Sequence, residues 1–289
     1  MKNTLKFLCL SLLILFSCNG TNTTSITDDE EEEETINLDN VIYNIPVFVN
    51  VVYKNNPLEE EVIENQIQFL NDVFAGRTTN LDDVPEQFRA TVAGDIKIRF
   101  FLEGIAQRET TKDSFDDTAE IAREALGIEA TDTGSVLNIW VAVLDGADGD
   151  STFPEDLADE DLFLEGVYID RSAFGVRNGI GIRNEGKQLV HEIGHFFNLF
   201  HLPGLTDDTS GCEFDDGVDD TPNSQDIYFG RLEQNISSCG SEDMFMNFME
   251  NVFDDTRIMF TKGQKARMRA TLVEDGVRAT YVESTTIEE

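Results

Sequence analysis

The chain has 289 residues, of which 40% are hydrophobic and 21 are Phe, so its length and composition allow one large domain with a sizeable core. Its 21 basic residues against 57 acidic ones give a formal net charge of -36. Such a charge repels nucleic acid and anionic membrane surfaces and excludes them as partners, whereas clustered carboxylates suit hard cations such as calcium.

Residues 1–17 have the three-part pattern of an export signal. Lys2 and Lys6 precede an apolar run that is too short to cross a bilayer, and a small residue and Cys18 follow. The end, LFSC, resembles a bacterial lipoprotein signal, which implies cleavage before Cys18 and lipid attachment to its thiol. A plain secretory signal with an incidental cysteine is the alternative. We therefore expect an exported chain, an outer-membrane or cell-surface lipoprotein that touches the membrane only through its N-terminal lipid.

Residues 18–35 contain seven consecutive acidic residues and almost no large apolar side chain. Such a segment cannot bury enough surface to offset the entropy of ordering it. We expect a disordered acidic tether that leads into a folded domain over residues 36–289.

Strands and helices alternate in the first part of this domain, an upper lobe over about residues 41–198. β-Branched, aromatic and alternating runs predict strands, and apolar residues at helical spacing predict amphipathic helices. The alternation indicates an α/β (α+β) fold. The strands are expected at 41–53, 95–103, 135–144 and 165–170, and the helices at 58–74 and 117–126.

The rest, residues 199–289, is interpreted as a loop-rich lower lobe. Residues 202–260 are mostly loop, and a loop of that length in a compact domain is usually functional or cross-linked. The last helix, residues 261–275, begins with Thr261 and Gln264 at the spacing of a capping box.

Two cysteines remain, Cys212 and Cys239, if Cys9 is removed with the signal and Cys18 is lipidated. In an exported chain they predict one disulfide, with two free thiols as the weaker alternative.

All three histidines of the chain lie in one stretch, KQLVHEIGHFFNLFH. Residues four apart on a helix point the same way, so His191 and His195 can bind one metal ion, and zinc is the usual occupant of H-E-x-x-H. Glu192 is turned by about 100° from His191. We expect it to be the general base that takes the proton of a water activated by the metal.

His201 is the expected third ligand, six residues after His195. A continuing helix would turn it away, so the helix must end first. In the longer three-histidine motif a Gly makes this break, and here the position is Asn198, the non-glycine residue that enters the left-handed region most readily.

This stretch resembles the metzincin zinc endopeptidases, and other segments resemble their pappalysin-like (cytophagalysin) branch. GCEFDDGVDDTP resembles that family's disulfide and calcium segment, MNFMENVFDD its Met-turn, and FTKGQKARM its C-terminal helix. DGDSTFP resembles the segment just before its substrate-binding edge strand. The resemblance covers about residues 41–275.

The resemblance implies a metzincin-like fold. The upper lobe would hold a twisted mixed sheet and two long helices, including the zinc-binding helix, and the lower lobe the Met-turn and the C-terminal helix. Met249 would form a hydrophobic floor under the zinc. An edge strand somewhere in residues 151–170 would pair with an extended protein or peptide substrate.

Further site residues follow from the same resemblance. Asp216, Asp220 and Thr221 would hold a structural calcium ion, with a solvated acidic loop as the alternative. Asn251 stands where the family usually has a Tyr near the zinc. Asp254 and Asp255 would line a substrate pocket that prefers basic side chains.

The chain is therefore interpreted as a zinc-dependent endopeptidase that hydrolyses extracellular proteins or peptides. One alternative is a binding or adhesion lipoprotein that keeps zinc with weak or no catalysis, which Asn198 and Asn251 favour and Glu192 opposes. Another is a structural surface protein whose metals only hold a loop-rich lobe together.

Overall fold

The computed structural model describes residues 38–154, 159–176, 185–204, 211–232 and 235–287. The predicted signal segment and tether, with Cys18, lie outside these residues. Asn37–Glu289 form one compact unit. In the described part of the chain, no helix is both long and apolar enough to cross a bilayer.

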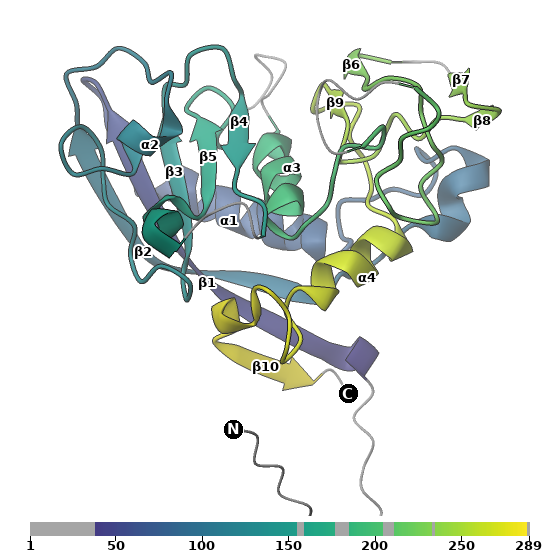
Figure 1. Ribbon diagram of the computed structural model, residues 1–289, viewed down its shortest axis with the longest axis horizontal. Coiled ribbons are helices and arrows are strands. Elements are labelled where there is room, and N and C mark those ends of the chain that lie inside the picture. The colour runs from purple at the N-terminus through teal and green to yellow at the C-terminus, as the bar shows by residue number, and fades with distance from the viewer. Residues whose placement is uncertain (1–37, 155–158, 177–184, 205–210, 233–234, 288–289) are drawn as a thin grey trace, which may run out of the picture. The chain divides into compact units, whose positions relative to one another are not determined.

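A six-stranded mixed sheet organises this unit (Figure 1). The strand order is β10-β1-β3-β5-β4, and β2 pairs with the other side of β1. β1, β2, β3 and β5 are parallel, whereas β4 and β10 are antiparallel to their neighbours. The predicted mixed α/β sheet is thus confirmed. Its strands are β1 (Val41–Tyr53), β2 (Ile98–Glu109), β3 (Leu137–Ala142), β4 (Gly149–Ser151), β5 (Val167–Asp170) and β10 (Ser284–Ile287).

The two faces of the sheet carry separate cores. Alternate residues of β1, such as Val47 and Val49, pack with the apolar sides of α1 (Glu60–Phe74) and α3 (Lys187–Phe196). On the opposite face Trp140 stacks on Tyr168 with ring centroids 4.8 Å apart. Each of these fully buried side chains contributes about 1.5–3 kcal/mol. Together the two cores fix β4 and α3 side by side at one end of the sheet (Figure 1).

Helix α2 (Thr118–Ile121) is much shorter than the predicted segment 117–126. The chain turns back at Gly127, and the Ile128 N–H donates to the Ile121 carbonyl at 2.9 Å. A Cβ on Gly127 would collide with that same carbonyl. Gly127 therefore serves a tight turn rather than ending a ten-residue helix.

The C-terminal residues depart from the predicted lower lobe. α4 (Lys262–Ala270) has the predicted capping box of Thr261 and Gln264 but ends before residue 275. After the short 3-10 helix Ala279–Tyr281, β10 returns to the sheet and pairs with the first four residues of β1. The last residues thus belong to the sheet and not to a continuous lower lobe.

The segment between α3 and α4 is mostly loop, as predicted. Its strands are two residues each, and the Cys212–Cys239 disulfide crosses it, with Cα atoms 5.3 Å apart, which confirms the predicted bond. The strands are β6 (Phe229–Gly230), β7 (Ser237–Ser238), β8 (Ser241–Glu242) and β9 (Asn251–Val252), and the other 3-10 helices are Leu38–Asn40, Glu86–Thr91 and Asp159–Leu164.

Candidate metal centre

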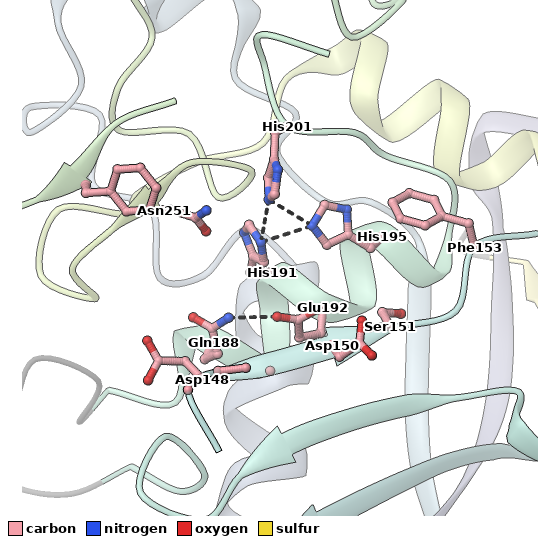
Figure 2. Close-up of a pocket in the computed structure, with 14 residues that line it drawn as sticks. Asp148, Asp150, Ser151, Phe153, Gln188, His191, Glu192, His195, His201 and Asn251 are labelled. Carbon is pink, nitrogen blue, oxygen red and sulfur yellow. Dashed lines mark hydrogen bonds between the residues drawn. The ribbon is translucent and has the colours of Figure 1, made fainter. Parts of the chain in front are cut away.

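The three histidines converge on one point. The Nε2 atoms are 3.0 Å apart between His191 and His195, 3.1 Å between His195 and His201, and 3.2 Å between His201 and His191. Figure 2 shows the three rings turned toward one another above the end of α3. Like polar atoms do not gather this closely in a buried place unless something between them compensates. The triangle therefore marks a binding point for a cation.

The other ring nitrogens fix the tautomers. His191 Nδ1 lies 2.7 Å from the Phe248 carbonyl, and His195 Nδ1 lies 2.7 Å from the Leu199 carbonyl. A carbonyl only accepts, so each Nδ1 carries the proton and each Nε2 presents its lone pair to the common point. Burial, assisted by the charge of Arg257, lowers the pKa of His191 well below its ordinary value. His191 is therefore neutral, as a metal ligand must be.

The end of α3 brings His201 back to its partners. α3 ends at Phe196, and Asn198 has φ 71°, in the left-handed region. The Leu199 N–H then donates to the Gly194 carbonyl at 2.9 Å, which closes the helix end. The backbone thus makes at Asn198 the break that the spacing of the histidines requires.

The donor set fits a tetrahedral transition-metal ion. Nitrogen ligands at about 2.0–2.1 Å from such an ion lie about 3.3–3.4 Å apart, close to the observed triangle. In the described ranges, these histidines are the one group of three potential ligands that come within 4.8 Å of one another. Three neutral imidazoles also suit zinc and similar ions better than calcium or magnesium.

Met249 lies directly against the metal-binding helix. It is fully buried, and a Cβ on Gly194 would collide with its sulfur. The Met249 N–H donates to the Asn247 side chain at 2.9 Å, which shapes the turn. Gly194 costs the helix about 1 kcal/mol relative to Ala, and this close approach explains its presence.

Glu192 faces a cavity of about 460 Å³ that also contains the three histidines. Glu192 as a residue is 4% exposed, and its carboxylate accepts a hydrogen bond from Gln188 Nε2 at 2.7 Å (Figure 2). On its other side, a Cβ on Gly149 of β4 would be 2.6 Å from Glu192 Oε1. Gln188 of α3 also lines this cavity, and the remaining lining comes from the β4 segment and the β6–β9 pair: Gly146, Ala147, Asp148, Asp150, Ser151, Phe153, Phe229 and Asn251.

Three of the residues in these contacts, Gln188, Gly149 and Gly194, were not predicted from the sequence. Gln188 precedes the motif on the same helix, and its place four residues before Glu192 was the available signal. For Gly149 and Gly194 the only hint was that each is a glycine inside a strand or helix, which can mean that another part of the chain packs closely there. The sequence does not show which residue packs against either glycine, because that residue comes from a distant part of the chain.

The structure places the three predicted substrate-pocket residues in different surroundings. Asn251 lines the cavity, but Asp254 and Asp255 do not. Asp254 is buried and accepts from the Glu185 N–H at 3.0 Å, so it supports the entry to α3. Asp255 forms an ion pair with Arg231 away from the histidines. The edge strand of the sheet is Gly149–Ser151, which meets the predicted range 151–170 only at Ser151.

The predicted calcium residues are held by protein donors. Asp216 Oδ1 accepts from the Thr221 hydroxyl at 2.7 Å, and Asp220 accepts from the Thr261 hydroxyl at 2.6 Å and the Gly263 N–H at 2.9 Å. Asp220 therefore stabilises the N-terminus of α4, where a negative charge is favourable. Burial, the largest cause, raises the pKa of Asp216 to about 6.

The site combines a helix that carries two histidines and a glutamate with a third histidine after a left-handed turn. A buried methionine packs against the same helix. This combination defines a metalloprotease site of the metzincin type. The family described as pregnancy-associated plasma protein-A, peptidase family M43, matches residues 168–273. Mature mirolysin of Tannerella forsythia, solved with a cleaved peptide, is 30% identical with a TM-score of 0.76, and the likeness covers 84% of this chain and 96% of mirolysin. The chain belongs to this pappalysin family of metallopeptidases.

Curated relatives agree over shorter segments. An extracellular metalloprotease of Arthroderma benhamiae is 35% identical over 89 residues, which are 30% of this chain and 29% of that protein. One of Pyricularia oryzae is 30% identical over 177 residues, 59% of each chain. The chain thus spans about three-tenths to three-fifths of the length of these curated relatives.

Proposed function

We propose that this chain is an exported zinc-dependent endopeptidase. The observation that carries the proposal is the set of three Nε2 atoms within 3.2 Å of one another, with the Glu192 carboxylate in the same cavity. A protein that only binds zinc needs no buried, hydrogen-bonded carboxylate beside the metal. The adhesion alternative therefore explains less of the site.

His191, His195 and His201 would hold the zinc ion. When bound, zinc supplies Lewis acidity that polarises the scissile carbonyl and lowers the pKa of a water. Glu192 accepts the proton of the attacking water and returns it to the leaving amine. Asn251, on the same cavity, would provide an amide donor for the developing oxyanion, a contribution worth about 3 kcal/mol in well-formed sites.

The substrate would be an extended segment of a protein or peptide. β4 is an edge strand at the cavity, paired with β5 on one side only among the described strands. An edge strand presents backbone donors and acceptors that an extended peptide can pair with. Mirolysin, the similar structure, is itself solved with a cleaved peptide.

Casein digestion by wild type and Glu192→Gln tests the enzyme proposal. The variant should retain one zinc per chain by metal analysis and lose about 100-fold or more of the activity, because a general base contributes about that much. A chelator should stop the wild type, and added zinc should restore it. Equal activity of the two proteins would contradict the proposal, and so would a wild-type protein that binds no zinc.

We also propose a structural calcium ion at Asp216. Its Oδ2 is buried and has no hydrogen-bond partner among the described residues, so a cation there would offset the cost of burying the charge. The melting temperature should fall with EGTA in the wild type and not in Asp216→Asn. An EGTA effect of equal size in both proteins would remove Asp216 from the ligands.

We propose export with lipid attachment at Cys18, from the LFSC pattern and from relatives named extracellular metalloproteases. A disulfide between Cys212 and Cys239 suits the same oxidising surroundings. Palmitate labelling in a bacterial host should mark the wild type and not Cys18→Ala. Release of both proteins in the same unlabelled form would support the plain secretory signal instead.

A further inference from the structure

A row of three buried side chains ends at Glu192. Arg257 Nη1 donates to Gln188 Oε1 at 2.8 Å, and Gln188 Nε2 donates to Glu192 Oε1 at 2.7 Å. Arg257 is fully buried, and Gln188 and Glu192 are each 4% exposed. The second of these hydrogen bonds is drawn in Figure 2. Because water is largely excluded, both bonds are strong and the geometry of the row is fixed.

Arg257 is itself held in place by the turn that contains Met249. Its Nε donates to the Glu250 carbonyl at 3.0 Å, and the Asp254 carboxylate lies 4.0 Å from Nη1. The Lys187 ammonium donates to the Arg257 carbonyl at 2.9 Å. The guanidinium therefore approaches α3 from the Met-turn side in one orientation.

This arrangement decides which way the Gln188 amide points. A guanidinium only donates, so the amide oxygen must face Arg257. The amide nitrogen then faces Glu192, which must present an acceptor. Without Arg257 the amide can rotate by half a turn and place its oxygen against the carboxylate, where two acceptors repel. Arg257 thus orients the Gln188 amide, and the amide in turn holds Glu192.

We propose that Gln188 and Arg257 are positioning residues for the general base, and this rests on the proposed endopeptidase function. Gln188 holds one carboxylate oxygen of Glu192 so that its orientation is set before the substrate arrives. Arg257 keeps the amide in the donating orientation. Neither residue is one of the three histidines expected to hold the metal, and Arg257 does not line the cavity.

The test compares Gln188→Met, Arg257→Met and the double variant with wild type in steady-state peptide hydrolysis. Loss of a residue that orients a metal-site group typically costs about 10- to 100-fold in activity. Gln188→Met should lose that much in kcat, with KM within about twofold and one zinc per chain. Arg257→Met should lose less, and the double variant no more than Gln188→Met, because the effect of Arg257 passes through Gln188. Arg257→Lys should recover part of the loss.

Arg269→Met is the matched control for removing a buried arginine. Arg269 donates to the Val41 carbonyl at 2.9 Å and does not line the cavity. It should lower the melting temperature and leave kcat unchanged. If Arg257→Met does not fold, Gln188→Met still decides the question.

Two outcomes would overturn the proposal. One is a Gln188→Met variant with kcat within twofold of wild type, while Glu192→Gln is inactive. The other is a double variant whose loss is the product of the single losses, which would show two independent effects. Failure of the proposed function is recognised separately, by Glu192→Gln being as active as wild type, and it would remove both ideas together.

Discussion

Gly149 has no side chain at the point where β4 passes Glu192, and adding one should impair catalysis without unfolding the protein. A Cβ there would lie 2.6 Å from Oε1, 2.8 Å from Cγ and 2.9 Å from Cδ of Glu192. Ordinary contact needs about 3.4 Å or more, so the carboxylate must move by roughly 0.8 Å in Gly149→Ala. A misplacement of about 1 Å can cost about 100-fold in rate.

We therefore expect Gly149→Ala to lose about 100-fold in kcat while retaining zinc. Ala is better than Gly in a strand by about 0.5–1 kcal/mol, so the free energy of unfolding should be unchanged or slightly higher. Steady-state hydrolysis, metal analysis and urea unfolding measure the three quantities. Gly104→Ala in β2, where the added Cβ would meet the Phe48 ring outside the cavity lining, is the control and should retain kcat. A Gly149→Ala enzyme within threefold of wild type would refute the steric argument.

Three further predictions concern the stability of the fold, and the first also concerns zinc binding. Asn198→Ala should lose about 1 kcal/mol of unfolding free energy and bind zinc more weakly, because Ala disfavours φ 71°, whereas Asn198→Gly should be near neutral by urea unfolding. Burial raises the pKa of Asp95, but hydrogen bonds from Arg99 and the Lys97 N–H outweigh it and lower the pKa from 3.8 to about 2. Above about pH 4, ionised Asp95 therefore adds about 2 kcal/mol to the free energy of unfolding, and this contribution is lost as the pH falls toward 2. Unfolding measurements should therefore show that the stability deficit of Asp95→Asn relative to wild type shrinks between pH 7 and pH 3. Replacing both Cys212 and Cys239 by Ser should cost about 3–4 kcal/mol, since the bond closes a loop of 27 residues, and calorimetry under non-reducing conditions measures the loss.

The parts of the site that come from one continuous stretch could be predicted from the sequence. His191, Glu192 and His195 share a helix, so their spacing alone places them together. Asn198 was predictable because a helix that must end before His201 needs a left-handed residue. The long first strand and α1 were predictable for the same reason, since each has a periodic pattern over more than a dozen residues.

The contacts between distant segments were not predictable in this way. Asp254 and Asp255 look alike in sequence as acidic residues after the Met-turn, yet one caps the start of α3 and the other pairs with Arg231. Only the path of the chain decides this. β10 has no strong strand pattern of its own, and it forms because β1 leaves an open pairing partner at its first four residues.

The metal-binding helix is held at both ends by the C-terminal half of the chain. At its start, Asp254 accepts from the Glu185 N–H and Arg257 reaches Gln188. At its end, Arg278 Nε donates to the Phe196 carbonyl at 2.6 Å, and the same guanidinium donates to the Thr152 carbonyl just after β4 at 2.9 Å. Arg278 thereby ties the end of α3 to the strand that would receive substrate. The positions of the histidines, the general base and the edge strand are therefore set by a few buried arginines, and a three-histidine motif alone would not supply that arrangement.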